Sequence, residues 1–202
     1  MNLHPAALVT ISGIAITALA PGLANAETND WFVGAAAGQS RPDLSYSTAL
    51  VERVDDEATA WRAFAGRRFG RHFAASLGYA ELGEVTLSGS SFGGFSDRTE
   101  VTLVELTAIG LWPMTTTIEV YALVGYAHWE QDVTQQAFGE SARFSASGQS
   151  ASLGLGAAWW FTDALGLQLE WRRYDEIGEF EKTGRENRWD VAMLGVSWRF
   201  GG

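Results

Sequence analysis

The strongest candidates for chemistry in this chain are a histidine and a glutamate two positions apart, His128 and Glu130. Residues two positions apart in a strand share one face, so this pair would place a base beside an acid. Acyl transfer also needs a hydroxyl nucleophile, which Ser147 or Ser150 would have to contribute from another segment. The same pattern is typical of an interfacial histidine and glutamate without a catalytic role. We favour that interpretation and expect no enzyme.

Composition excludes several other chemistries. The chain has no cysteine, which excludes disulfides, thiol catalysis and cysteine-bound metals. Its histidines form no cluster and no close repeat with acids, so we expect no metal site and no cofactor. The formal net charge of −10 argues against nucleic acid as a partner, because phosphate binding needs a basic surface.

In several strand-like segments, polar residues and charged residues of both signs alternate with apolar residues. They share their face with many glycines, so they would point into the interior of a curved sheet. An unpaired charge in a narrow, poorly hydrated interior is costly, and we therefore expect these residues to pair. The predicted lumen network consists of Arg62, Glu105, Gln168, Glu170, Arg172 and Arg199.

The last strand-like segment, 191–200, indicates which kind of sheet would carry this interior. It alternates strictly between an apolar face that ends in aromatics and a face that holds Gly, Ser and Arg. Strict alternation is the period of a strand. A soluble protein buries the large residues, whereas a transmembrane barrel turns them to lipid and keeps the small and polar residues inside. We predict the second arrangement.

Eight strand-like segments alternate with connections of two lengths. Three connections are tight, at 70–71, 113–117 and 162–164, and four are long, at 41–58, 83–99, 133–146 and 175–186. Short turns at one end and long loops at the other are typical of outer-membrane barrels. We predict an all-β fold, an eight-stranded antiparallel up-and-down transmembrane β-barrel, with strands at 31–40, 59–70, 72–82, 100–112, 118–132, 147–161, 165–174 and 187–200.

Aromatic residues lie near both ends of these segments on the face expected to point outward. Between them this face carries Ala, Val and Leu and no charge. Aromatic girdles flank the lipid-facing band of a membrane barrel, whereas a soluble ligand-binding barrel has a charged exterior. The expected girdles are Trp31, Phe69, Phe73, Trp112, Trp159, Phe161, Trp198 and Phe200 near the tight turns, and Trp61, Tyr79, Tyr126 and Trp171 near the long loops.

The N-terminus has the features of a secretory signal peptide over residues 1–26. An apolar run at 6–20 is followed by Ala24-Asn25-Ala26, a small-x-small cleavage site. Pro21 and Gly22 interrupt the run and no stop-transfer charges follow, which argues against an uncleaved membrane helix. Residues 27–202 fit a single barrel domain.

We expect the protein isolated from membranes to begin at Glu27, because cleavage follows Ala26. Intact-mass analysis measures this directly. A membrane-isolated species that retains Met1 to Ala26 would contradict the prediction.

Several motifs together resemble the transmembrane domain of the OmpA family of outer-membrane proteins. The resemblance covers nearly all of residues 27–202 and implies an eight-stranded barrel with both termini in the periplasm. It also implies that barrel-assembly machinery recognises the outward face of the final strand, here Leu194, Val196, Trp198 and Phe200. The motifs are 104–108 leading into Trp112-Pro113, Val120-Tyr121, 123–125, Trp129, 169–171, 177–179 and 194–200.

The chain also departs from that family. The family's lumen contains a salt-bridge gate of two acids and two bases. The resemblance aligns the acids with Ser76 and Ala158 and the bases with Ile109 and Gln168, so we expect no such gate here. Because the sequence ends at Gly202, two residues after Phe200, we also expect no periplasmic peptidoglycan-binding domain.

Acidic residues gather in two of the predicted long loops. Hard divalent cations bind carboxylate oxygens, so these loops could hold cations that bridge to lipopolysaccharide. A solvated loop is the simpler interpretation, and we favour it. The residues are Glu52, Asp55, Asp56 and Glu57 in the first loop, and Asp175, Glu176, Glu179 and Glu181 in the last.

These features predict a protein of the outer membrane of a Gram-negative bacterium. We expect a structural or surface role, in envelope integrity or adhesion, for a monomeric barrel. Its expected partners are outer-membrane lipids and lipopolysaccharide, with the barrel-assembly machinery during biogenesis. Two alternatives stay open. One is a narrow non-specific pore, and the other is a lipid A-modifying enzyme centred on His128, since some eight-stranded outer-membrane barrels are such enzymes.

Overall fold

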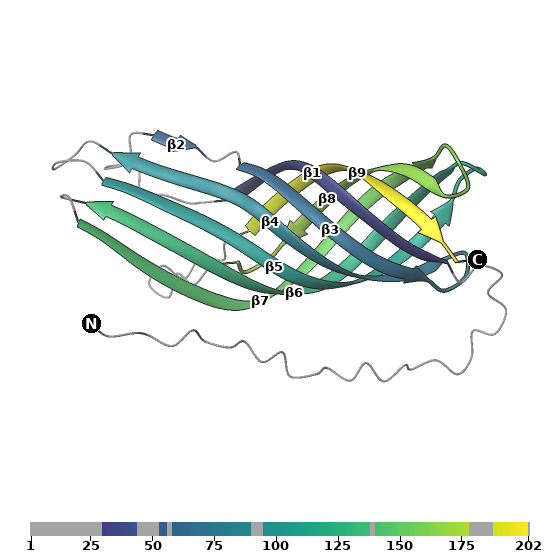
Figure 1. Ribbon diagram of the computed structural model, residues 1–202, viewed down its shortest axis with the longest axis horizontal. Helices are drawn as coiled ribbons and strands as arrows, with labels where there is room; N and C mark the ends of the chain where they lie inside the picture. Colours follow the sequence, from purple (N-terminus) through teal and green to yellow (C-terminus); the bar gives the residue numbers. More distant parts are fainter. Residues whose placement is uncertain are drawn as a thin grey trace.

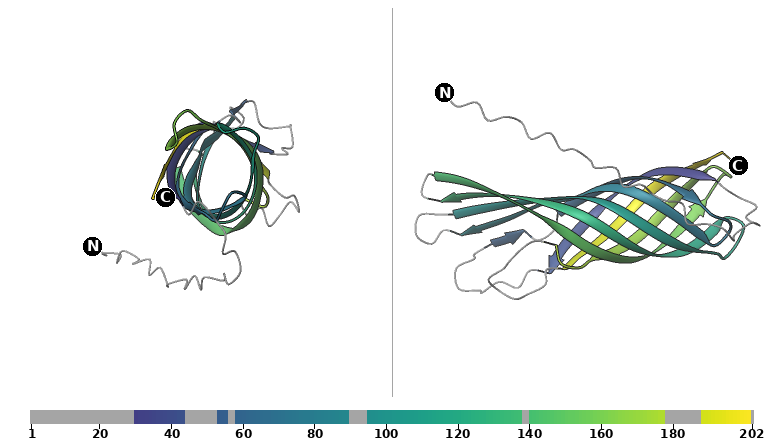
Figure 2. Two further views of the ribbon diagram at one scale, coloured as in Figure 1. Left: turned by 90° about the vertical axis from the view of Figure 1, so that its right-hand side faces the viewer. Right: turned by 90° about the horizontal axis from the view of Figure 1, so that it is seen from below.

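The computed structural model describes residues 30–43, 53–55, 58–89, 95–137, 140–177 and 188–201, which form nine antiparallel strands. Eight of them close into a barrel in chain order, with β1 hydrogen-bonded to β9 and β4 to β5 (Figures 1 and 2). No helix in the described ranges is long and apolar enough to cross a membrane. The strands are β1 Trp31–Asp43, β2 Arg53–Asp55, β3 Ala58–Arg68, β4 Phe73–Gly89, β5 Phe95–Pro113, β6 Ile118–Ala137, β7 Glu140–Trp160, β8 Leu165–Tyr174 and β9 Arg188–Phe200.

The eight-stranded barrel is confirmed, but two of the predicted loops are wrong. The segments 83–99 and 133–146 are mostly strand, because β4 runs to Gly89, β5 starts at Phe95, and β6 and β7 are separated only by residues 138–139. Both faces of these extensions carry polar residues, so the alternation that marks a strand is missing there. Continuous backbone pairing from the barrel decides the structure instead.

The predicted loop at 41–58 is wrong in part as well. Residues 41–43 extend β1, and β2 adds a short strand that pairs Arg53–Asp55 with residues 86–88 of β4. Three residues are too few for a periodic signal, so only the edge that β4 offers makes them a strand.

Strand length separates the barrel from a projecting sheet. About 9–11 residues cross a membrane in a tilted strand, and β3 and β8 have 11 and 10. Strands β4 to β7 have 17 to 21 residues and continue beyond the barrel as two long hairpins (Figure 1). A β-bulge at Gly83, with a φ of 84°, lies between Glu81 and Glu84 at the start of the extension. A left-handed φ favours glycine, and bulges bend a strand.

The barrel's exterior is apolar and its interior holds the polar residues. Every predicted girdle aromatic is exposed, from 37% for Trp171 to 59% for Phe73. Leu77, Val124 and Leu194 in the band between the girdles are about as exposed, at 58%, 64% and 61%. This is the inverse of a soluble ligand-binding barrel. One cation joins the girdle at the tight-turn end, where the Arg67 guanidinium lies 5.5 Å from the Trp31 ring and 5.8 Å from the Phe69 ring.

Candidate functional site: a filled lumen

The first layer of charges in the lumen centres on Glu170 of β8. Its Oε1 lies 3.3 Å from Arg62 Nη1 and accepts a hydrogen bond from Arg172 Nε at 3.0 Å. The hydroxyl of Tyr121 donates to its other oxygen, Oε2, at 3.1 Å. The three charged residues are at most 6% exposed, so these contacts form away from solvent.

Arg172 links Glu170 to a second buried acid, Glu105 of β5. The Arg172 Nη1 group contacts Glu105 Oε2, which also accepts a hydrogen bond from the Tyr174 hydroxyl at 3.3 Å. The Ser152 hydroxyl donates to the other oxygen of Glu105. Each guanidinium therefore has an acid partner, and each acid has at least one neutral donor, as a buried ionic network requires. We call these residues, Arg62, Glu105, Glu170 and Arg172, the central network.

A second layer of charges lies nearer the tight turns. Arg68 binds both oxygens of Glu119 in a fork, with distances of 3.0 and 2.7 Å. Arg199 Nη2 lies 3.2 Å from Glu119 Oε1 and its guanidinium carbon is 3.2 Å from the centre of the Trp160 ring. Fork geometry and stacking on aromatic rings are both typical of arginine. We call Arg68, Glu119 and Arg199 the lower network.

A cavity of about 50 Å³ separates the two networks. Arg62 and Glu170 line it from the central network, and Arg68, Glu119 and Arg199 from the lower one. Gln168 also lines it and accepts a hydrogen bond from the Ser197 hydroxyl at 3.0 Å. By the criterion of about 10–15 Å³ per water, the cavity has room for a few water molecules.

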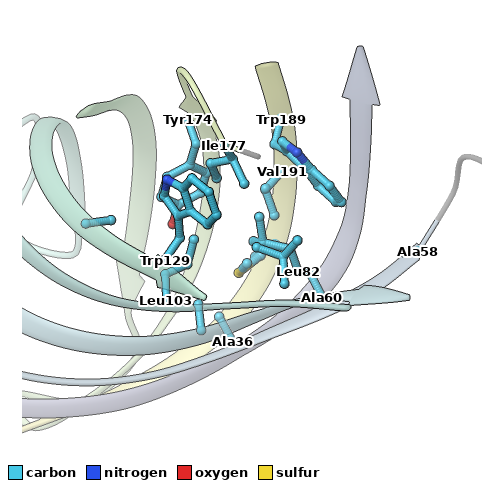
Figure 3. Close-up of a cluster of buried hydrophobic side chains, with 14 residues drawn as sticks. Ala36, Ala58, Ala60, Leu82, Leu103, Trp129, Tyr174, Ile177, Trp189 and Val191 are labelled. Carbon is cyan, nitrogen blue, oxygen red and sulfur yellow. The ribbon is translucent and has the colours of Figure 1, made fainter. Parts of the chain in front are cut away.

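An apolar cluster closes the other end of the lumen, above the central network. It consists of inward-facing side chains at the ends of the strands opposite the tight turns, and Figure 3 shows them inside the curve of the sheet. Leu82, Leu103 and Trp129 are 0%, 1% and 3% exposed, and Tyr174 and Trp189 are 0% and 4% exposed. Its polar atoms are few: the Tyr174 hydroxyl is held by Glu105, and the Trp129 indole nitrogen is a lone buried donor, so the layer offers water little hydrogen bonding. We call it the mouth cluster.

The predicted lumen residues fall into separate layers. The structure brings Arg62, Glu105, Glu170 and Arg172 together, whereas Gln168 contacts Ser197 and Arg199 joins the lower network. The reason is position along the strands, because Gln168 and Arg199 lie closer to the tight turns than Glu170 and Arg172. Sequence reasoning missed Glu119, Tyr121 and Ser152 as partners. The alternation within β6 would have placed Glu119 and Tyr121 inward.

The mouth cluster was also missed. The sequence did carry a signal for it. Trp129 and Tyr126 lie three residues apart in one strand, so they point to opposite faces, and with Tyr126 outward Trp129 must point inward. Inward aromatics at one level of several strands predict an apolar layer, but only the register of the closed barrel shows that they meet.

The candidate catalytic residues do not assemble into a triad. His128 and Glu130 are exposed on the outer face of β6, and their partners on β7 are Gln149 and Ser147. Ser150 faces inward, and its hydroxyl donates to the carbonyl oxygen of Asp175. Within the described part of the chain, no hydrogen bond joins His128 to a serine or an acid.

The acidic loop residues are described only in part. Glu52, Asp56, Glu57, Glu179 and Glu181 lie outside the described residues, as do residues 1–26 of the predicted signal peptide. Asp175 forms an ion pair with Arg188, with 3.4 Å between Oδ1 and Nε. Among the residues whose positions are described, no group of three or more His, Asp or Glu side chains forms a metal-binding cluster.

Comparison with known families decides what kind of barrel this is. The OmpA-like transmembrane domain matches residues 26–202. The chain belongs to this family. Outer membrane protein A of Shigella dysenteriae is 27% identical to this OmpA-like barrel over 200 residues, which cover 94% of the chain and 55% of that relative. The chain thus spans about half the length of the curated relatives it matches.

Solved structures show the same fold. Ail, the attachment invasion locus protein of Yersinia pestis, has a TM-score of 0.57 at 14% identity, with 85% of this chain and 99% of that chain covered. Neisserial surface protein A has a TM-score of 0.56 at 15% identity, with 84% and 97% covered. At these identities the likeness concerns the fold alone.

Family membership places this OmpA-like barrel in the bacterial outer membrane. The apolar exterior band therefore faces lipid. The four positions aligned with the family's gate charges, Ser76, Ile109, Ala158 and Gln168, all line the cavity between the networks.

The closing strand offers a test of insertion. Trp198 and Phe200 face outward on β9, 54% and 42% exposed, with ring centroids 5.4 Å apart. We expect Phe200→Asp to impair insertion, because a charge on the lipid face near the interface costs up to about 1 kcal/mol and the change also removes the closing aromatic that the assembly machinery is expected to recognise. The readout is the heat-dependent gel mobility of the folded barrel in isolated membranes. The matched control is Phe200→Tyr, which keeps the ring and should insert normally. Ser197→Asp would not serve, because Ser197 faces the lumen. Normal membrane levels of heat-modifiable Phe200→Asp would contradict the prediction.

Proposed function

We propose that this OmpA-like barrel has a structural or surface role in the outer membrane and that it does not conduct ions or solutes. The observation that carries the proposal is the filled lumen: two ionic networks and the mouth cluster occupy successive levels of the interior. A path through the barrel would have to separate buried ion pairs and hydrate an apolar layer. Both steps are unfavourable.

The projecting hairpins support a surface role. They carry polar side chains on exposed faces, and local contacts hold them, such as the Arg98–Glu84 ion pair at 2.5 Å and the Ser145–Asp132 hydrogen bond at 2.6 Å. With the termini and the tight turns on the periplasmic side, as the family resemblance implies, the hairpins stand outside the cell among lipopolysaccharide molecules. The acidic loops next to them would be solvated, and the barrel would work as a monomer after insertion by the barrel-assembly machinery.

Planar-bilayer recording tests the proposal directly. We expect negligible conductance from the purified wild-type barrel, whereas steady conductance would favour the pore. The lipid A-modifying alternative is tested by mass spectrometry of lipid A from cells with and without the gene. The enzyme would be favoured if lipid A is modified in cells that carry the wild-type gene but not in cells that carry the His128→Ala variant instead.

Deletion of the gene distinguishes the structural from the surface contribution. Complementation uses the wild-type chain and a variant in which short turns replace the β4–β5 and β6–β7 extensions. If both chains restore normal envelope permeability, that role belongs to the barrel. If only the wild type restores adhesion, that role belongs to the hairpins. If deletion changes neither property, the proposed function is wrong.

A further inference from the structure

The cavity between the two networks has more hydrogen-bond donors than partners for them. The Ser76 hydroxyl, the Trp160 indole nitrogen and Arg62 Nε are buried without a hydrogen-bond partner, and all three residues line the cavity. Ser76 and Arg62 are each 3% exposed, so bulk water does not reach them freely. Buried polar groups without partners are rare in folded proteins and indicate an unseen occupant.

The charges around the same cavity are unbalanced. In the described part of the lumen, the four guanidinium groups of Arg62, Arg68, Arg172 and Arg199 face the three carboxylates of Glu105, Glu119 and Glu170. The central network is balanced, so the excess lies in the lower network. There, Arg68 already occupies both oxygens of Glu119, and Arg199 shares one of them. Asp30, half-exposed at the rim, is near enough for its charge to act on Arg199, but it does not line the cavity and forms no ion pair with Arg199 among the described contacts.

We propose that this cavity is a binding site for a small monovalent inorganic anion, of the size of chloride, held between Ser76 and Trp160 and compensating the charge of Arg199. An anion can accept hydrogen bonds from several donors at once, whereas a water molecule must also find acceptors for its own hydrogens. The volume of about 50 Å³ admits a halide and a few waters. It excludes large organic anions such as gluconate.

Thermal unfolding of the refolded full chain in detergent tests the site. At constant ionic strength, replacing sodium gluconate by sodium chloride should raise the unfolding midpoint of the wild type with a saturable dependence on chloride, because a ligand that binds only the folded state stabilises it. Arg199→Gln should lose this rise. It removes the excess charge and leaves the Arg68–Glu119 pair neutral and intact.

Two further variants make the result specific. Ser76→Ala removes one donor and should weaken the chloride dependence. If Arg199→Gln fails to give a heat-modifiable barrel, Ser76→Ala alone tests whether chloride binds in the cavity. Arg98→Gln removes an arginine from an ion pair on the projecting hairpins and should keep the full chloride dependence. An equal midpoint in both salts for the wild type, or an undiminished rise in both lumen variants, overturns the proposal.

Bromide provides a structural readout. Crystals soaked in bromide should show an anomalous peak at hydrogen-bonding distance from Ser76 Oγ, and crystals of Arg199→Gln should lack it. Waters alone in the cavity overturn the proposal. A bromide peak without any chloride dependence in solution means binding at crystal concentration only, which also overturns it.

Discussion

Glu170→Ala should lower the free energy of unfolding by roughly 3–5 kcal/mol, because removal of one partner from a buried ionic network leaves an uncompensated charge. Glu170 holds Arg62 and Arg172 and accepts a hydrogen bond from Tyr121. Without it, two buried guanidinium groups share the single carboxylate of Glu105. The measurement is urea unfolding of the refolded barrel in lipid vesicles, followed by tryptophan fluorescence.

The matched control is Glu84→Ala. This glutamate also pairs with an arginine, Arg98, but the pair lies on the projecting hairpins with side chains 33% and 58% exposed. Water screens such a pair, so its removal should change stability far less. Glu170→Gln adds a second comparison, since the amide oxygen still accepts from Tyr121 while the charge is lost.

Glu170→Ala also reports on whether the lumen is hydrated. A filled lumen closed to bulk water predicts a large loss of stability for Glu170→Ala together with negligible conductance of the wild type. A hydrated pore predicts an almost unchanged unfolding midpoint and steady wild-type conductance, because water would solvate the charge that remains. The second pair of results would reverse the ranking of the two functions.

Gly38→Ala should prevent the barrel from closing properly. Gly38 lies on β1 opposite Met193 of β9, at the seam where the first and last strands meet. A Cβ atom there would overlap the carbonyl oxygen of Ala192 and lie 2.7 Å from Met193 Cα. The obstacles are backbone atoms, which cannot move aside as a side chain can. We therefore expect a cost at or above the upper end of the roughly 1–3 kcal/mol typical of overpacking.

Gly110→Ala makes the same chemical change where the nearest atom is the far end of the exposed Trp112 ring, at 3.2 Å. It should fold with near-normal yield. The readout for both variants is the fraction of heat-modifiable barrel after refolding into vesicles. Equal fractions for the two variants would show that the β1–β9 seam tolerates the extra methyl group.

Much of the fold was predictable because the lipid environment acts on each residue separately. Whether Leu194 or Trp198 points outward depends on the alternation of its own strand, and that alternation can be read from consecutive residues. The projecting parts of β4 to β7 were not predictable in this way. Outside the membrane both faces meet water, so the sequence there shows no periodic pattern although the backbone stays paired.

The sequence by itself determined the barrel, its apolar exterior and its polar interior, because these follow from local periodicity. Only the tertiary structure decided which interior residues meet. Arg172 of β8 reaches Glu105 of β5, and Arg68 of β3 reaches Glu119 of β6, across a lumen bounded by strands far apart in the chain. Such pairs depend on the register of every intervening strand and on barrel closure, and no short stretch of sequence contains that information.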